Sequence, residues 1–215
     1  MEKDITEKIR KTGIIPVVVI DSAKDALPLG RALTNGGLLA AEVTFRTDAA
    51  KEAIEILAKE YPEMLVGAGT VLTHEQADAA VAAGAKFLVT PGFNPEQVSY
   101  CLNKGYNIIP GVQTPGEMEQ ALDMGFKIVK FFPAEAAGGL NMLKAVAAPY
   151  TELTFMPTGG INENNVRDYL AYNRIIACGG SWMVKKDLIA EGKFEEIKDL
   201  TAKAAGIVKE IRGNV

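Results

Sequence analysis

Residues 14–20 read IIPVVVI, a short run of apolar and mostly β-branched side chains that is followed by the polar residues Asp21 and Ser22. Such a run, bounded by polar and turn-forming residues, predicts a β-strand. Seven similar runs follow, and the eight starts are about 23 residues apart on average, which is the length of one strand with its helix and loops. The runs begin near Ile14, Leu39, Leu65, Lys86, Asn107, Lys127, Leu153 and Arg174.

The segments between these runs have the pattern and the ends of helices. Residues 48–60 place Ala53, Ile54 and Leu57 on one stripe, as in an amphipathic helix packed on a core. Residues 4–11 predict an additional N-terminal helix, and residues 194–212 predict an amphipathic C-terminal helix. Cap residues predict other helix starts and glycines predict helix ends. The predicted starts are Thr73, Asn94, Thr114 and Asn162, and the predicted ends are Gly84, Gly105 and Gly125.

Near-continuous apolar strands that alternate with helices are typical of a parallel sheet covered by helices. Eight such units in 215 residues predict one domain, residues 1–215, with an α/β fold of the (β/α)₈ TIM-barrel type. We expect the additional N-terminal helix to close the bottom of this barrel. A doubly wound sheet is the alternative, because periodicity does not establish closure. No G-x-G-x-x-G motif follows the first run, which weakens the dinucleotide-binding form of that alternative.

Composition and charge exclude several classes of function. The 23 Lys and Arg residues against 27 Asp and Glu give a net charge of -4, so there is no basic excess for nucleic-acid binding. The apolar runs are too short to span a membrane, and the N-terminus has no signal-peptide core, so we expect a cytoplasmic protein without a membrane partner. One histidine, His74, and two cysteines in no ligand-like spacing predict that no metal is bound and argue against Ser-His-Asp chemistry.

Two predicted strands carry a charge where a strand covered on both faces is normally apolar. By the period of two, Glu42 shares a face with Arg46, and Lys130 shares a face with Phe132. These strands are the second and sixth of eight, and inward residues of even-numbered barrel strands occupy the same layers. We therefore expect Glu42 and Lys130 to meet inside the barrel and to perturb each other's pKa. A structural ion pair is the alternative, although such pairs are usually no more stable than apolar replacements.

Small residues end the third and fourth predicted strands. Gly67, Gly69 and Thr70 end the third, and Pro91 follows the fourth. We expect them to let a ligand carboxylate or carbonyl approach the rim closely.

Glycine-rich turns follow the seventh and eighth predicted strands, as Thr158-Gly159-Gly160 and Gly179-Gly180-Ser181. Barrels commonly hold a phosphate at these two positions through backbone N–H groups. The alternative is a pair of tight turns without a ligand.

Together these motifs resemble those of the 2-dehydro-3-deoxy-6-phosphogluconate (KDPG) aldolase family over about residues 14–184. The resemblance implies a class I pyruvate aldolase, an aldehyde-lyase of the Entner–Doudoroff route that needs no metal or cofactor and forms a homotrimer. It is carried, in this order, by residues 42–47 (EVTFRT), 66–71 (VGAGTV), 90–92 (TPG), 110–112 (PGV), 130–135 (KFFPAE), 157–160 (PTGG) and 179–182 (GGSW).

The same resemblance implies a role for each matching residue. Lys130 corresponds to the Schiff-base lysine and Glu42 to the general acid/base. The remaining correspondences are Arg46 and Thr70 at the pyruvate carboxylate, Pro91 along that pocket, Phe132 against the Schiff base, and Thr158, Gly159, Gly160, Gly179, Gly180 and Ser181 at the phosphate. Some relatives place an arginine at the end of the first strand, where this chain has Val17-Val18-Val19-Ile20, so that contact is missing here.

The implied reaction cleaves KDPG into pyruvate and D-glyceraldehyde 3-phosphate, with 4-hydroxy-2-oxoglutarate as a second substrate. An iminium on Lys130 accepts the electron pair of the broken C–C bond better than a ketone does, and it requires a neutral lysine. Two alternatives are a phosphosugar-binding barrel isomerase or synthase and a non-catalytic phosphosugar-binding protein. The preference among KDPG, its galactonate epimer and 4-hydroxy-2-oxoglutarate also stays open.

Overall fold

The computed structural model describes residues 1–213, in which strands and helices alternate as the spacing predicts. The strands are β1 (Ile14–Val18), β2 (Ala40–Thr44), β3 (Leu65–Gly69), β4 (Phe87–Val89), β5 (Ile108–Ile109), β6 (Gly111–Val112), β7 (Ile128–Phe131), β8 (Thr154–Pro157) and β9 (Cys178–Gly180). The α-helices are α1 (Lys3–Thr12), α2 (Ala26–Asn35), α3 (Ala50–Glu60), α4 (His74–Ala82), α5 (Pro95–Asn103), α6 (Pro115–Asp123), α7 (Gly139–Ala147), α8 (Val166–Ala171), α9 (Lys186–Ala190) and α10 (Phe194–Arg212). A short 3-10 helix, η1 (Ala23–Asp25), precedes α2.

The strand pairs in the two sheets are parallel, which confirms the predicted α/β class. The larger sheet has the order β5-β4-β3-β2-β1-β9, and the smaller has the order β6-β7-β8. Strands β5 and β6 lie on either side of Pro110 and together form the fifth predicted run. Two isolated parallel bridges, Phe155 with Ile175 and Thr158 with Gly179, join β8 to the segment that contains β9.

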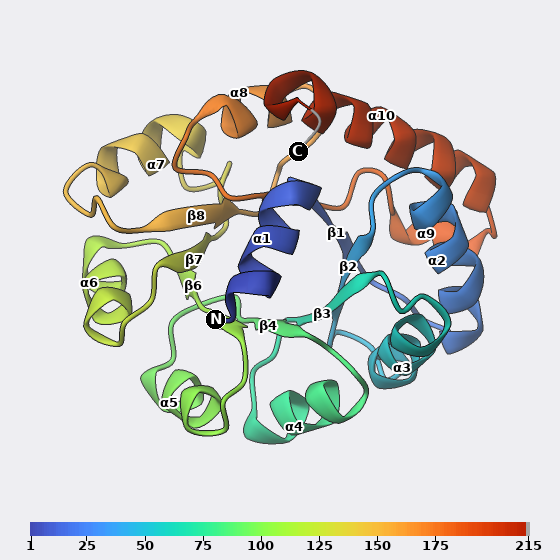
Figure 1. Ribbon diagram of the computed structural model, residues 1–215, viewed down its shortest axis with the longest axis horizontal. Helices are drawn as coiled ribbons and strands as arrows, with labels where there is room; N and C mark the ends of the chain where they lie inside the picture. The colour runs from blue at the N-terminus through green and yellow to red at the C-terminus, as the bar shows by residue number, and fades with distance from the viewer. Residues whose placement is uncertain (214–215) are drawn as a thin grey trace.

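Helices surround the strands, and α1 lies across the middle of the ring that they form (Figure 1). The outward side chains of the strands pack with the buried stripes of the helices in one large apolar cluster. A second cluster forms inside, where Ile5 and Ile9 of α1 pack with residues at or near the first position of their strands, including Ala40, Leu65 and Ile128. Helix α1 therefore covers the amino ends of the strands, as the sequence predicts for an N-terminal helix.

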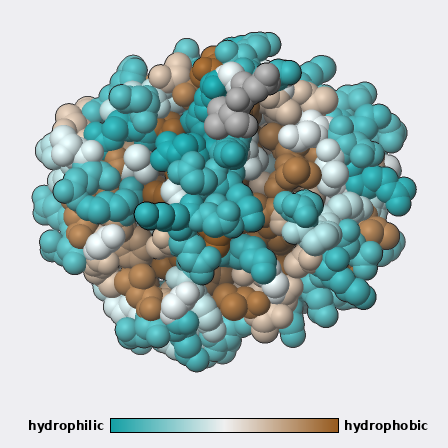
Figure 2. All heavy atoms as spheres, in the orientation of Figure 1, coloured by the Kyte–Doolittle hydropathy of each residue, from teal (hydrophilic) through white to brown (hydrophobic). Residues whose placement is uncertain are grey.

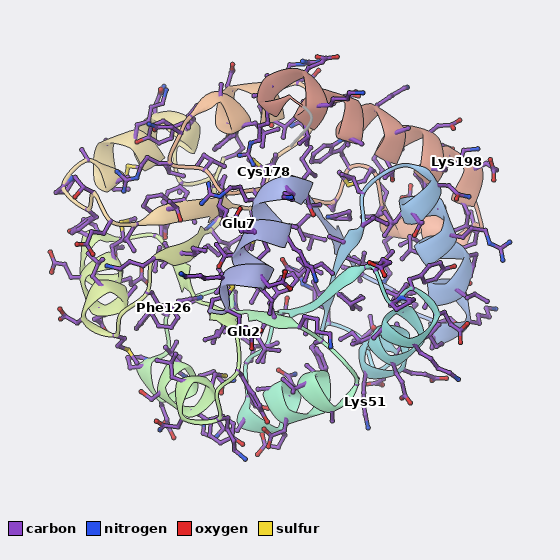
Figure 3. All side chains as sticks on the ribbon, viewed as in Figure 1. Glu2, Glu7, Lys51, Phe126, Cys178 and Lys198 are labelled. Atoms are coloured by element: carbon purple, nitrogen blue, oxygen red, sulfur yellow. The ribbon has the colours of Figure 1, made fainter. Side chains whose placement is uncertain are left out.

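The view in Figure 2 looks onto this amino-end face, where the polar outer side of α1 lies among apolar patches. One hollow of about 440 Å³ beside α1 is lined by Thr6, Phe126 and Ile128, among others. Figure 3 shows Phe126 next to the N-terminal part of α1. The carboxyl ends of the strands, where the candidate site lies, are on the opposite face.

Most predicted helix ends agree with the structure, and one does not. Asn94 and Thr114 accept hydrogen bonds from first-turn N–H groups, and Thr114 forms a complete capping box with Glu117. Thr73 caps α4 by accepting from the N–H of Gln76, while the Gln76 side chain accepts from the Leu72 N–H, so a capping box is only half formed there.

The predicted helix start at Asn162 is wrong, because α8 begins at Val166. Asn162 and Asn165 instead bond within the preceding turn. None of the helices in residues 1–213 is long and apolar enough to cross a membrane.

Candidate active site

Strands β2 and β7 bring Glu42 and Lys130 together in the interior. Each residue is the third of its strand, one step beyond the layer that packs on α1. The Lys130 Nζ lies 3.8 Å from Glu42 Oε1, a separation at the outer limit of an ion pair. The Glu42 side chain is fully buried, and that of Lys130 is 5% exposed. The pair that the period of two predicted is therefore present in the structure.

Burial acts on both members of this pair in the direction of the neutral form. Desolvation raises the pKa of Glu42, and the positive charges of Lys130 and Arg46 only partly oppose this. Desolvation also lowers the pKa of Lys130, with the nearby Arg46 adding to the effect and Glu42 opposing it. A depressed pKa increases the fraction of lysine that is neutral and able to attack a carbonyl.

The Glu42 carboxylate has no hydrogen-bond partner in the part of the chain that the structure describes. Both of its oxygens are buried without one, although Lys130 lies nearby. A buried carboxylate kept only for stability would have its lone pairs satisfied, because an unsatisfied buried charge is costly. This arrangement instead leaves both oxygens available to a substrate or water.

Two glycines in β3 make room for larger side chains in the interior. A Cβ at Gly69 would lie 2.1 Å from Glu42 Oε1, and one at Gly67 would lie 2.3 Å from the Phe87 ring. The sequence predicted that these glycines would let a ligand approach the rim. That explanation is wrong for Gly67, because the Phe87 ring fills the space beside it. At Gly69 the space is instead occupied by the Glu42 carboxylate.

Phe132 lies next to the lysine at the end of β7. Its ring centroid is 4.8 Å from Lys130 Nζ, within cation–π range when the amine is charged. The ring is half-buried, so it also shields the amine from solvent on one side. A planar ring face at this position suits a flat, positively charged imine bound there.

Arg46 and Thr70 meet at the carboxyl-end rim. The Arg46 Nε donates to Thr70 Oγ1 at 3.3 Å, while the rest of the exposed guanidinium stays available for a carboxylate. Thr70 has a φ of 56°, which is rare for a β-branched residue and turns the chain sharply after β3. Such strain at the end of a strand is common in binding sites.

Pro91 lies in the next loop of the rim. The backbone of Pro91 packs against Gly111, where a Cβ would come 2.4 Å from the Pro91 carbonyl. The Thr90 hydroxyl accepts from the Gly111 N–H and donates to the Gly92 carbonyl, which fixes the loop. Gly111 also pairs with Lys130 in the strand register. These contacts hold Pro91 beside β6, which pairs with the strand that carries Lys130.

The two glycine-rich turns are adjacent in space. Thr158 and Gly179 form a parallel bridge, and a Cβ at Gly159 would lie 3.4 Å from the Phe132 ring. The turns therefore lie next to the β7 end that carries Phe132. Ser181 is exposed beyond β9, and the Trp182 ring packs closely over Gly180.

The first of these turns presents a row of N–H groups. In residues 1–213, the N–H groups of Gly160 and Ile161 donate to no protein acceptor, whereas that of Gly159 faces the Gly179 carbonyl across the bridge. Gly159 and Gly160 have φ values of 100° and 79°, conformations that suit glycine. Successive N–H groups in such a turn form a concave site for an anion.

Two further residues belong to this turn, and the sequence did not indicate their role there. Asn162 and Asn165 both donate from their side-chain amides to the Gly160 carbonyl, at 3.0 and 3.1 Å. The sequence pointed only to Asn162, and only as a helix cap. Across the described residues, no three His, Cys, Asp or Glu side chains are grouped as metal ligands would be.

Comparison with known proteins decides the family. The model of the KDPG and KHG aldolase family matches residues 5–200. The chain belongs to the KDPG and KHG aldolase family. This confirms the resemblance found in the sequence and makes the protein an aldehyde-lyase.

The 2-dehydro-3-deoxy-phosphogluconate aldolase of Treponema pallidum (strain Nichols) is 50% identical over 204 residues, which cover 95% of this chain and 97% of that protein. The KHG/KDPG aldolase of Escherichia coli (strain K12) is 41% identical, over 94% of this chain and 95% of that one. Both similarities extend through all the strands and the candidate site.

The solved structures agree with this family assignment. The KDPG aldolase of Legionella pneumophila superposes with a TM-score of 0.88 at 40% identity, covering 92% of this chain and 96% of that one. That crystal structure holds pyruvate captured as a covalent carbinolamine intermediate.

Proposed function

We propose that this KDPG and KHG aldolase cleaves 2-dehydro-3-deoxy-6-phosphogluconate into pyruvate and D-glyceraldehyde 3-phosphate through an imine on Lys130. The observation that carries the proposal is the buried pair in which Lys130 Nζ lies 3.8 Å from the Glu42 carboxylate, which has no hydrogen-bond partner within residues 1–213. A class I aldolase requires at least a lysine nucleophile and, close to it, a group that can donate and accept protons. The carbinolamine of the Legionella pneumophila relative supports the same chemistry.

Lys130 is the nucleophile in this proposal. Its lowered pKa supplies the neutral amine that adds to the C2 carbonyl of the substrate. Loss of water gives a protonated imine, which accepts the electron pair when the bond between C3 and C4 breaks. The Phe132 ring, 4.8 Å from Nζ, provides a flat surface for that imine.

Glu42 moves the protons. It protonates the departing hydroxyl of the carbinolamine, accepts the proton of the C4 hydroxyl during cleavage, and governs protonation of the enamine at C3. One carboxyl group can alternate between these steps because burial raises its pKa toward working pH. Its unoccupied lone pairs leave it free to do so.

Two further groups of residues hold the ends of the substrate. Arg46 and Thr70, joined by a hydrogen bond, bind the carboxylate, and Pro91 lines that pocket. The phosphate binds at the two turns formed by Thr158, Gly159, Gly160, Gly179, Gly180 and Ser181. Fixing both ends orients C3 and C4 between Lys130 and Glu42, so that remote binding energy lowers the barrier.

Trapping of the imine tests the proposal. The protein is incubated with pyruvate and borohydride, and its intact mass and peptide map are measured. We expect one reduced pyruvate adduct on Lys130, with no adduct on the Lys130→Ala variant. An adduct on another lysine, or no adduct on folded protein, would exclude Lys130 as the Schiff-base residue. The Glu42–Lys130 pair would then be a structural ion pair. Cleavage that persists in EDTA is expected, because no step uses a metal.

A second substrate, 4-hydroxy-2-oxoglutarate, is favoured by the Escherichia coli relative, which is described as a KHG/KDPG aldolase. The carboxylate end and the catalytic pair serve both substrates, and only the phosphate turns distinguish them. The ratio of kcat/KM for the two substrates measures this preference.

We also infer that the two sheets close into one eight-stranded barrel, with a single domain over residues 1–215. The bridges between β8 and the β9 segment support closure on one side, and the N–H of Lys130 donating to the Pro110 carbonyl supports it on the other. The family resemblance adds a homotrimer and a cytoplasmic location to the proposal. Light scattering coupled to gel filtration measures the oligomeric state.

A further inference from the structure

The turn after β8 is held by hydrogen bonds to its carbonyl groups. The Gly160 carbonyl accepts from two side-chain amides, Asn162 Nδ2 at 3.0 Å and Asn165 Nδ2 at 3.1 Å. The Gly159 carbonyl accepts from the backbone N–H of Glu135 at 3.0 Å. The Gly160 carbonyl is therefore directed at the asparagine amides, and the Gly159 carbonyl is directed at the Glu135 N–H.

The two asparagines are themselves fixed by the oxygen ends of their amides. Asn165 Oδ1 accepts from the Asn162 N–H at 2.8 Å, and Asn162 Oδ1 accepts from the Asn164 N–H at 2.9 Å. Each amide oxygen thus has a backbone donor, which leaves the NH₂ end of each side chain for the Gly160 carbonyl. The network accounts for the orientation of both side chains.

The geometry of the peptide bond explains how this network favours the binding of an anion. In a planar trans peptide, the C=O and the N–H of the following residue point in opposite directions. Holding the Gly160 carbonyl on the asparagine side directs the Ile161 N–H away from it, and holding the Gly159 carbonyl does the same for the Gly160 N–H. Neither of these two N–H groups has a protein acceptor among residues 1–213.

Without the asparagines, the peptide between Gly160 and Ile161 would be free to turn over. Gly160 is exposed and adopts a φ of 79°, and glycine can adopt several other conformations at low cost. A turned peptide would place a carbonyl oxygen where an anion is to bind and would remove one N–H donor. Electrostatic repulsion would then replace a charge-assisted hydrogen bond.

We propose that Asn162 and Asn165 are positioning residues that set the preference of this enzyme for phosphorylated over unphosphorylated 2-oxo acids. They touch neither the substrate nor the catalytic pair, and they act by fixing the Gly160–Ile161 peptide. The inference rests on the proposed function, because it assigns the phosphate of the substrate to this turn.

The test compares Asn162→Ala, Asn165→Ala and Asn165→Asp with the matched control Asn164→Ala. Asn164 is an exposed neighbour that contributes only its backbone N–H, which alanine retains. Asn165→Asp keeps the oxygen that accepts from the Asn162 N–H but loses the donor to the Gly160 carbonyl. It therefore distinguishes the loss of this donor from a change in the fold of the turn. Thermal unfolding of each variant checks that the fold is intact.

We expect kcat/KM for KDPG to fall about tenfold in each of the three variants, mainly through KM, since one weakened charged contact is worth about a factor of ten. For 4-hydroxy-2-oxoglutarate, kcat/KM and the yield of the pyruvate adduct should change less than about twofold. The Asn164→Ala variant should match the wild type. Equal losses on both substrates, or no loss on KDPG in any variant, would overturn the proposal.

A binding experiment does not depend on catalysis. Inorganic phosphate is titrated into ¹⁵N-labelled protein, and the amide shifts of Gly159, Gly160 and Ile161 are followed. We expect saturable shifts in the wild type and Asn164→Ala, with about tenfold weaker binding in Asn165→Asp. Wild-type amides that do not respond would overturn the proposal even if Lys130 forms its imine. Amide shifts without imine formation would support the anion site and contradict the proposed aldolase chemistry instead.

Discussion

The Glu42 carboxylate occupies the space where a side chain at position 69 would begin, since a Cβ on Gly69 would lie 2.1 Å from Glu42 Oε1. Strands β2 and β3 are in parallel register, with Thr44 opposite Gly69, so the carboxylate leans across the neighbouring strand toward its carboxyl end. The absence of a side chain in β3 therefore determines where the proposed acid/base group lies relative to Lys130.

Replacing Gly69 with alanine should displace this carboxylate and slow the proton transfers. A shift of about 1 Å in a catalytic group costs about 10²-fold in rate, so we expect kcat for KDPG cleavage to fall by that order. Steady-state kinetics and imine trapping measure the two steps separately, and trapping should be reduced less than kcat. Gly206→Ala, in a helix with open space around the site, is the matched control and should keep full activity. Full activity in Gly69→Ala would show that the carboxylate position is not critical.

Removing the buried pair should abolish activity without destabilising the protein. Replacing a buried ion pair by uncharged residues of similar volume is often neutral or stabilising, because desolvation of both charges is avoided. We expect the double variant Glu42→Gln with Lys130→Met to lose cleavage by about 10³-fold or more and to unfold at the wild-type urea concentration or above it. Strong destabilisation of the double variant would favour the structural ion pair.

The raised pKa of Glu42 predicts how the free energy of unfolding depends on pH. Because the pKa of the buried carboxyl is raised above 4.5, the folded state binds a proton that the unfolded state has already lost over the interval between the two pKa values. The free energy of unfolding contributed by Glu42 therefore falls as pH rises from 4.5 through the folded pKa, and the loss remains at higher pH.

Urea unfolding of the wild type and Glu42→Gln from pH 4.5 upward measures this contribution. The variant should gain stability relative to the wild type as pH rises, and the two should be similar near pH 4.5. The opposite trend, with the wild type gaining on the variant, would mean that the ionised carboxylate is a net stabilising partner of Lys130.

Arg46 should matter equally for both proposed substrates, because it binds the carboxylate that they share. We expect Arg46→Ala to raise KM for KDPG and for 4-hydroxy-2-oxoglutarate by about 10- to 100-fold, the range for a lost charge-assisted contact. Initial rates on both substrates measure this, with the exposed Arg31→Ala on α2 as the control. A much larger loss on KDPG alone would place Arg46 at the phosphate end.

The sequence by itself predicted the alternation of strands and helices, because the burial of both strand faces leaves apolar runs at regular spacing. It also predicted that Glu42 and Lys130 face inward, since the period of two assigns each strand residue to a face. Caps such as Asn94 and Thr114 were predictable because they depend on residues within one turn.

Contacts between distant segments were not predictable in this way. The period of two says which face a residue is on, but the neighbour across that face depends on strand register and packing. Gly67 and Gly69 were expected to admit a ligand, whereas the fold fills their space with Phe87 and Glu42. Asn162 was expected to begin a helix, because a cap and a turn residue have the same local preference.

The sequence determined the family, the parallel α/β class and the identity of the two inward charged residues, each of which depends on local pattern or on motifs read in order. Only the tertiary structure decided that the Glu42 oxygens have no hydrogen-bond partner among residues 1–213, that Gly69 sets their position, and that two asparagines hold the Gly160 carbonyl. These features depend on distances of a few ångströms between side chains, which packing fixes after the strands have paired.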